Sequence, residues 1–203
     1  NYGAMNFSPD GLWLATGTTD GRIALWEALT GEKVMDVGSH QDSVDTLGFG
    51  RDSGQLVSGG GEGVCYLWDL RPPPNDPAKD LAGLWADLSN DSAYRAWRAM
   101  WELSADAERA APFLAEKLSG VKTFMDPDDM GDDVSEKEAN RRRRLKRLLI
   151  EREPGVEHRV TAHRAMAVLA NLKSSEGRRY LKELAAKNPD SDVGRLAAAV
   201  IAG

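Results

Sequence analysis

The spacing of apolar residues changes once along the chain, close to residue 71. Before that point short apolar runs such as Leu12–Ala15 and Arg22–Trp26 are separated by turn residues. Runs of about five residues between turns are typical of β-strands. After residue 78 the spacing becomes i, i+3 and i+7, as in Leu81, Leu84 and Leu88, which is the pattern of an amphipathic helix. The sequence therefore predicts a β region followed by an all-α region.

Two segments of the β region repeat the same order of residue types. The segment from Asn6 to Glu27 contains Ser-Pro-Asp-Gly, Thr-Gly, Asp-Gly and Leu-Trp, and the segment from Gly48 to Asp69 contains Asp-Ser-Gly, Ser-Gly, Glu-Gly and Leu-Trp. The Asp-Gly and Ser-Pro-Asp-Gly motifs are turn signals, because Gly and Asp tolerate positive φ. The two Leu-Trp motifs are 42 positions apart, within the period of about 40–45 residues of WD40 blades.

These motifs, with Gly38-Ser39-His40 in the place of a Gly-His dipeptide, resemble WD40 repeats over residues 1 to about 70. The resemblance implies two antiparallel blades divided near residues 38–47. It also implies a structural hydrogen-bonded network in each blade, made by a histidine, a strand Ser or Thr, a turn carboxylate and the Trp. The residues at these positions are Thr16, Asp20 and Trp26 in the first blade and His40, Ser58, Glu62 and Trp68 in the second.

Two features of the repeats lead to further expectations. Glu62 stands where the family has Asp, so its longer side chain must fold back to reach the same donor. Propellers have about four to eight blades, and the chain begins at Asn1 within a repeat. We therefore expect a partial propeller from the C-terminal part of a longer protein, with the missing N-terminal blades of its own chain as one partner.

A proline-rich stretch follows the second repeat. Four of the seven residues from Arg71 to Pro77 are prolines, which lack an amide donor and cannot continue a central strand. We interpret it as a linker before the helices, where Asn90 or Asp91 is expected to cap one helix and Pro112 to begin another. The predicted divisions are two WD40 repeats at 1–70, a linker at 71–77, a helical hairpin domain at 78–120, an acidic loop at 121–138 and HEAT-like helices at 139–203. The predicted buried seam of the helices contains Trp85, Trp97, Trp101 and Leu114.

The tail repeats parts of the first helical segment. Arg98-Ala99-Met100 is echoed by Arg164-Ala165-Met166, and the stretch Asp190–Ala197 resembles the opening of a HEAT-type unit. Taken together, the repeats, the linker and the helices resemble large bacterial WD40 proteins that carry a HEAT-like helical extension. Members of that family resemble scaffolds, so the resemblance implies binding of other proteins.

Composition and charge narrow the functional classes. With 41% hydrophobic and 29% charged residues the chain is typical of a soluble globular protein, and no apolar run approaches the ~20 residues of a membrane span. Cys65 is the only cysteine, which excludes an intrachain disulfide and favours a cytoplasmic location. Residues 1–71 contain ten acidic and four basic side chains, so the repeats are a poor surface for nucleic acid.

A charge block lies between the two helical segments. Residues 126–138 contain seven acidic groups and residues 139–152 contain seven basic ones. The basic patch consists of Arg141, Arg142, Arg143, Arg144, Lys146 and Arg147. It is open to two interpretations, a site for nucleic acid, acidic lipid or an acidic partner, or a solvated helix face, and we favour the second. Lys137 at the twelfth loop position breaks the EF-hand pattern, and no metal or cofactor is predicted.

We therefore expect a non-enzymatic scaffold for protein–protein interactions, built from WD40 blades and HEAT-like helices. A catalytic role for His40 is not expected, because a buried histidine in a repeat is commonly structural. The alternative is a regulatory or localising module of a larger enzyme, such as a kinase or protease, whose catalytic domain lies upstream. A nucleic-acid binder that acts through the helix at 141–147 is less favoured.

Overall fold

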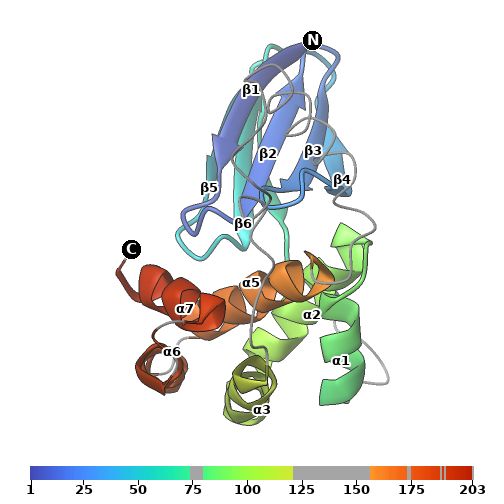
Figure 1. Ribbon diagram of the computed structural model, residues 1–203. Helices are drawn as coiled ribbons and strands as arrows, with labels where there is room; N and C mark the ends of the chain where they lie inside the picture. The colour runs from blue at the N-terminus through green and yellow to red at the C-terminus, as the bar shows by residue number, and fades with distance from the viewer. Residues whose placement is uncertain (74–79, 121–155, 173–174, 188, 190, 203) are drawn as a thin grey trace, which may run out of the picture. The chain divides into compact units, whose positions relative to one another are not determined.

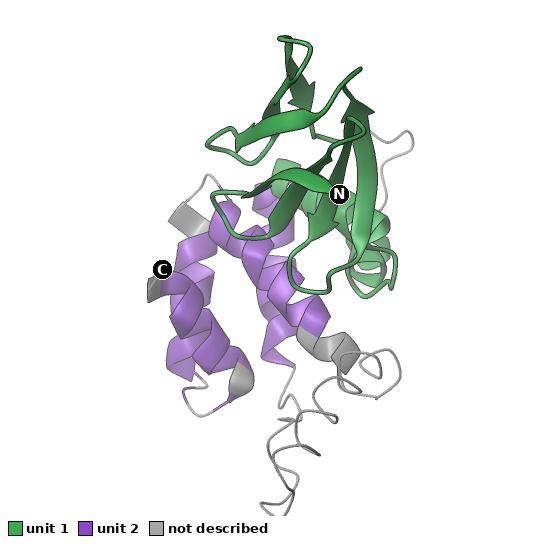
Figure 2. Cartoon of the chain, turned by 90° about the horizontal axis from the view of Figure 1, so that it is seen from above, with its two compact units in different colours: residues 1–106 green, residues 107–203 purple. Residues whose placement is uncertain are grey.

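The computed structural model describes residues 1–73, 80–120, 156–172, 175–187, 189 and 191–202. The chain divides into two compact units, Asn1–Asp106 and Ala107–Gly203 (Figure 2). Within the described residues, two antiparallel sheets are followed by six helices (Figure 1). The predicted fold class, two propeller blades and then an all-α region, is confirmed.

The first blade is a four-stranded sheet in the order β1-β2-β3-β4. Leu14 lies opposite Trp26, and Ala15 lies opposite Leu25. Because side chains alternate along a strand, Thr16 shares one face with Trp26, while Ala15 and Leu25 lie on the other face and are buried. The strands are β1 (Tyr2–Phe7), β2 (Trp13–Thr18), β3 (Arg22–Glu27) and β4 (Lys33–Ser39).

The second blade has three strands among the described residues, in the order β5-β6-β7. Leu56 lies opposite Trp68, and Ser58 lies opposite Tyr66, so these four side chains share one face. The strands are β5 (Val44–Phe49), β6 (Gln55–Gly60) and β7 (Cys65–Asp69). The prediction of antiparallel strands joined by short turns is thereby confirmed for both repeats.

The two blades pack face against face, with β5 in contact with β1 and β2. Val44 lies directly against Gly17, so closely that a Cβ at Gly17 would overlap its side chain. The ring of Trp68 lies equally close to Gly38 of β4. The Asn6 side chain adds a polar link by donating to the backbone oxygen of Leu47 at 2.9 Å. Small residues in the first blade thus let the larger side chains of the second approach it.

The turn between β2 and β3 also connects the blades. Gly21 has φ +86°, a conformation that glycine adopts without steric cost, as the Asp-Gly signal predicts. Its carbonyl oxygen accepts a hydrogen bond from the His40 amide at 2.9 Å. The segment that enters the second blade is therefore fastened to the first.

Two helices belong to the same compact unit as the blades: α1 (Leu81–Leu88) and α2 (Ala93–Ala105). Asp80 caps α1, where its carboxylate accepts a hydrogen bond from the Gly83 amide at 2.7 Å. α2 contacts α1 and β4, and the Trp101 indole lies beside the turn before β6, 3.2 Å from the position of a Cβ at Gly54. The compact unit of residues 1–106 therefore includes both helices. The predicted linker at 71–77 stays a prediction.

The second unit contains α3 (Ala107–Ser119), α5 (Val156–Asn171), α6 (Ser175–Lys187) and α7 (Asp192–Ala202). α6 contacts each of the other three helices. Their buried residues include Leu114, Met166, Leu169, Leu181 and Val193. The HEAT-like interpretation of these helices stays a prediction.

Two expectations about helix ends are wrong. Ser92 is the N-cap of α2, and Asn90 instead accepts a hydrogen bond from the Ser92 amide at 2.9 Å. α3 begins at Ala107, so Pro112 lies inside the helix. The apolar stripe of α3 extends back to Ala110 and Ala111, both buried, and burial of that stripe outweighs the hydrogen bond that a proline removes.

The four residues of the predicted seam have different environments. Trp97 and Leu114 are buried, in α2 and α3 respectively, whereas Trp85 and Trp101 are half-buried. Trp101 lies against the blade rather than only against other helices. The predicted acidic loop and the whole charge block lie outside the described residues.

We expect a segment of residues 1–106 to be more stable than a segment of residues 1–71, because α2 covers part of the blade. Trp101→Ala should lower the free energy of unfolding of the longer segment by about 1–3 kcal/mol, less than the ~3–5 kcal/mol of a fully buried tryptophan. Thermal and chemical denaturation measure both effects. Arg95→Ala, at an exposed position of the same helix, is the control and should change stability by less than about 0.5 kcal/mol. Equal stability of the two segments would contradict the docking of α2.

Candidate functional site

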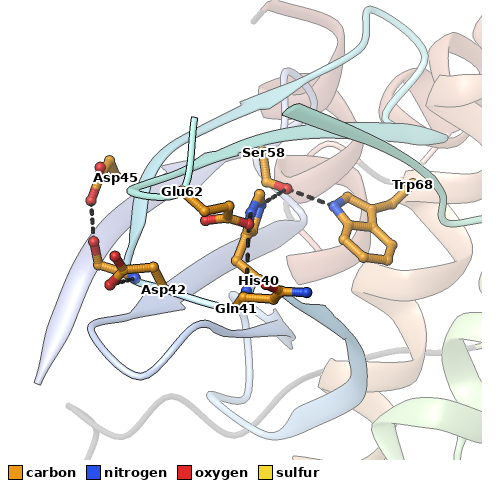
Figure 3. Close-up of polar contacts among 8 residues, drawn as sticks. His40, Gln41, Asp42, Asp45, Ser58, Glu62 and Trp68 are labelled. Carbon is orange, nitrogen blue, oxygen red and sulfur yellow. Dashed lines mark hydrogen bonds and ion pairs between the residues drawn. The ribbon is translucent and has the colours of Figure 1, made fainter. Parts of the chain in front are cut away.

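A chain of three hydrogen bonds crosses the second blade (Figure 3). The indole N–H of Trp68 donates to Ser58 Oγ at 2.8 Å. Ser58 Oγ lies 2.7 Å from His40 Nε2, and His40 Nδ1 lies 2.6 Å from Glu62 Oε1. The structure therefore brings the four residues that the WD40 resemblance selects in this blade into one connected line.

Each member of this chain comes from a different element. Ser58 lies in β6 and Trp68 in β7, and the antiparallel register puts both on the face that packs against the first blade. His40 follows β4, and Glu62 lies in the turn between β6 and β7, which is closed by a hydrogen bond from the Gly63 amide to Gly60 O at 2.9 Å. The chain of hydrogen bonds thus joins a strand pair, a turn and the entry to the blade.

We assign the protons along this line from the donors and acceptors that each side chain has. An indole N–H only donates, so Ser58 Oγ accepts from Trp68 and has one hydroxyl proton left to donate. That proton goes to His40 Nε2, and the imidazole then carries its own proton on Nδ1 and donates it to Glu62. In this tautomer the indole N–H, the serine hydroxyl and both imidazole nitrogens each have a partner along the line.

The Glu62 carboxylate is held in its charged form. Burial by itself raises the pKa of Glu62, but hydrogen bonds from its own backbone amide, from His40 and from the Gln41 amide outweigh burial and hold the pKa below its usual value. Oε2 is buried and accepts no hydrogen bond within the described residues. A Cβ at Gly60 would overlap both Glu62 Oε2 and the His40 ring, so the glycine provides the room that the longer carboxylate needs.

The first blade has a shorter version of the network. The Trp26 indole donates to Thr16 Oγ1 at 2.8 Å, at the positions equivalent to Trp68 and Ser58. Asp20 does not extend this pair in the described structure but forms an ion pair with Arg22 at 3.1 Å on the surface. A hydrogen bond with Thr18 is the main cause that lowers the pKa of Asp20, and Arg22 adds to it.

The order Ser58, His40, Glu62 has the geometry of a serine–histidine–carboxylate triad, but the environment does not suit catalysis. A nucleophile has to reach a substrate, and the Ser58 side chain is completely buried. Its oxygen is also occupied by the Trp68 N–H. The arrangement stabilises the blade, which is the role that the sequence analysis expects for these residues.

Other candidate residues fall into two groups. The basic patch of Arg141, Arg142, Arg143, Arg144, Lys146 and Arg147 lies outside the described residues. Within the part of the chain that the structure describes, no group of three or more His, Cys, Asp or Glu side chains is arranged to hold a metal ion. Over the same residues, no helix combines the length and the apolar character needed to span a bilayer.

Sequence reasoning missed two contributors to the site. Gly60 makes space for Glu62, and the Gln41 amide donates to Glu62 Oε1 at 3.4 Å. The run Gly59-Gly60-Gly61 was the available signal for the first, because consecutive glycines in a strand end indicate close approach of other groups. A backbone donor such as Gln41 leaves no signal in residue type.

Part of the chain is similar to known proteins. Residues 3–27 and 31–69 match the family model "WD domain, G-beta repeat". WD repeat-containing protein 1 of Gallus gallus is 36% identical over 69 residues, which cover 32% of this chain and 11% of that protein. Ribosome biogenesis protein ERB1 of Debaryomyces hansenii is 39% identical over 76 residues, covering 34% and 9%. The Cps50 (Swd1) β-propeller domain of Myceliophteria thermophila has 26% identity and a TM-score of 0.33, covering 34% of this chain and 22% of that one.

Antiparallel sheets that pack face to face in this way are the blades of a β-propeller. Residues 3–27 and 31–69 are WD40 repeats by this match, which covers less than half of the chain. The chain spans about a tenth of the length of these curated relatives.

Ser58→Ala should destabilise the chain by about 1–3 kcal/mol, because it leaves the half-buried Trp68 N–H and the buried His40 Nε2 without a partner. Ser58→Thr is the matched control, since a threonine at the equivalent position of the first blade makes the same bond to tryptophan. Chemical denaturation compares the two variants. Equal stability of Ser58→Ala and wild type would mean that the hydrogen-bonded chain does not stabilise the blade.

The pKa of Glu62 also predicts a pH dependence. Because the folded-state pKa lies below the ordinary value of 4.5, the stability contributed by the Glu62 carboxylate is present above pH 4.5 and is lost as the pH falls through the folded pKa. Glu62→Gln, which cannot titrate, should therefore be less stable than wild type at pH 7, with the difference shrinking below pH 4.5. Urea denaturation across that pH range measures it. A constant difference at all pH values would contradict the assignment.

Proposed function

We propose that this chain is a non-enzymatic scaffold for protein–protein interactions, in which WD40 blades provide a rigid binding surface and the helical unit provides a second, HEAT-like one. The main support for the proposal is that the side chains of the second blade that could take part in catalysis are all engaged in internal hydrogen bonds. His40, Ser58 and Glu62 bond to one another inside the second blade, which leaves rigidly held strands and turns for recognition. Similarity to a WD repeat-containing protein and to a ribosome biogenesis protein supports the same role.

Charge indicates the chemistry of the partner. Ten acidic and four basic side chains in residues 1–71 make the blade segment acidic, which favours a basic protein surface over nucleic acid. The β4–β5 turn shows how such charges are oriented: the Ser43 amide and hydroxyl hold Asp42 and Asp45, each at 2.7 Å, and both carboxylates are exposed (Figure 3). A cytoplasmic location is part of the proposal, and the use of a single cysteine, Cys65, supports it weakly.

The proposal predicts that a partner protein binds less tightly when the blades lose negative charge. Affinity capture with the whole chain, followed by quantitative mass spectrometry, should retain specific proteins at low salt and lose them as salt rises. Asp42→Asn with Asp45→Asn keeps the turn's hydrogen bonds and should weaken capture by about threefold or more, since rim charges act mainly on association.

The matched control removes two charges elsewhere. Glu108→Gln with Glu116→Gln changes exposed side chains of α3 by the same total charge and should leave capture by the blades unchanged. Equal capture by wild type and both double variants would contradict an acidic blade surface. Capture of no protein in stoichiometric amount would contradict the scaffold.

A further inference from the structure

Two consecutive helices of the chain are anchored in different compact units. α2 contacts α1 and β4, and its Trp101 indole lies beside Gly54 of the second blade. α3 contacts α5 and α6. The boundary between the units falls between Asp106 and Ala107 (Figure 2). Each of the two helices is therefore held by the core of its own unit.

One residue connects these helices. α2 ends at Ala105, and α3 begins at Ala107. Asp106 between them has φ −111° and ψ 58°, which lies outside the helical region. Its amide donates to Glu102 O at 3.3 Å and closes the last turn of α2. The direction in which the chain leaves the first unit is therefore set by the two backbone dihedral angles of Asp106.

The side chains around this connection are less buried than those on either side of it. Leu103 in α2 and Ala110 in α3 are completely buried. The six residues between them, Ser104 to Arg109, are all exposed or half-buried. In a helix six residues make more than one turn, so the junction has a whole turn without a buried side chain. Segments with little burial are those that change conformation most easily.

The helical hydrogen-bond ladder is also interrupted at the junction. The last four carbonyl groups of one helix and the first four amides of the next have no partner inside their own helix. Pro112 lacks an amide, so α3 also loses the bond that residue 112 would make to Glu108. The Asp106 amide moves with α2, and its carbonyl group moves with α3. Rotation about ψ of Asp106 therefore breaks no bond of either ladder.

We propose that Asp106 is a hinge about which the blade unit and the helical unit change their orientation. Three observations support it: the separate packing of α2 and α3, the non-helical backbone of Asp106, and the low burial of the residues around it. Hinges are commonly a few residues at the ends of elements that absorb a change in φ and ψ. The helices on both sides stay intact, so the two units move as bodies.

A hinge at this position changes what a chain with two binding surfaces can do. Two linked surfaces bind a partner more tightly than either alone only when both reach it at the same time. Movement at Asp106 lets the blades and the helices reach sites at different spacings. This consequence rests on the proposed function, whereas the hinge does not. The hinge is therefore tested on the whole chain without a partner.

Distances between two spin labels, measured by double electron–electron resonance, test the proposal. Cys65 is exposed and is the only cysteine of the sequence, so it takes the first label. Lys182→Cys, at an exposed position of α6, takes the second. This pair has Asp106 between its labels. Its distance distribution should be broader, by about twofold or more, than that of a pair within one unit.

Two label pairs within single units are the controls. Cys65 with Arg95→Cys reports on the first unit. Glu116→Cys with Lys182→Cys, in a chain that also carries Cys65→Ser, reports on the second. Both distributions should be narrow. If the distribution across Asp106 is as narrow as these two, the units are rigidly joined and the proposal is wrong.

Glycine substitutions locate the movement. Asp106→Gly widens the range of φ and ψ at the connection, so it should broaden the Cys65–Lys182 distribution further. Asp91→Gly makes the same change at an exposed residue between α1 and α2, inside the first unit, and should leave the distribution as in wild type. Circular dichroism confirms that both variants are folded. No broadening by Asp106→Gly, or equal broadening by both variants, would overturn a hinge at Asp106.

Discussion

The hydroxyl of Ser58 receives the Trp68 N–H and donates to His40, so one buried oxygen connects β6, β7 and the segment that enters the blade. Aromatic contacts connect the same residues, since the centroid of the Tyr66 ring lies 4.8 Å from that of His40 and 5.4 Å from that of Trp68. Trp68 in turn packs on Gly38 of the first blade. The position of one indole ring therefore depends on the internal hydrogen bond and determines how closely the two blades approach. A buried polar group without its partner costs more than the bond contributes when made, and this asymmetry holds the geometry in place.

The helices after the linker extend the same unit. Polar and proline-rich residues separate β7 from α1 in the sequence, yet α2 contacts β4 and Trp101 lies beside Gly54. A half-buried tryptophan covers a large apolar area at an end of the blade. Residues 1–106 consequently form a compact unit in which two helices pack with two sheets.

The two repeats are similar in sequence and different in environment. Thr16 and Ser58 make the same bond to tryptophan, but only the second repeat has a histidine among the described residues to continue the line. In the first blade the turn carboxylate pairs with Arg22 at the surface instead. The two repeats therefore use similar residue types in different polar contacts.

The sequence by itself determined the strands, the turns and the family of the first 69 residues, because alternation, Asp-Gly turns and the 42-residue offset are local or periodic signals. It also selected the residues His40, Ser58 and Trp68, which the structure brings together. Only the tertiary structure decided that Gly60 makes room for Glu62, that Trp101 lies against a blade, and that α3 continues through Pro112. These features depend on contacts between residues distant in the sequence, where burial of apolar area outweighs local preference. Residue types alone do not specify which other residues a side chain will contact.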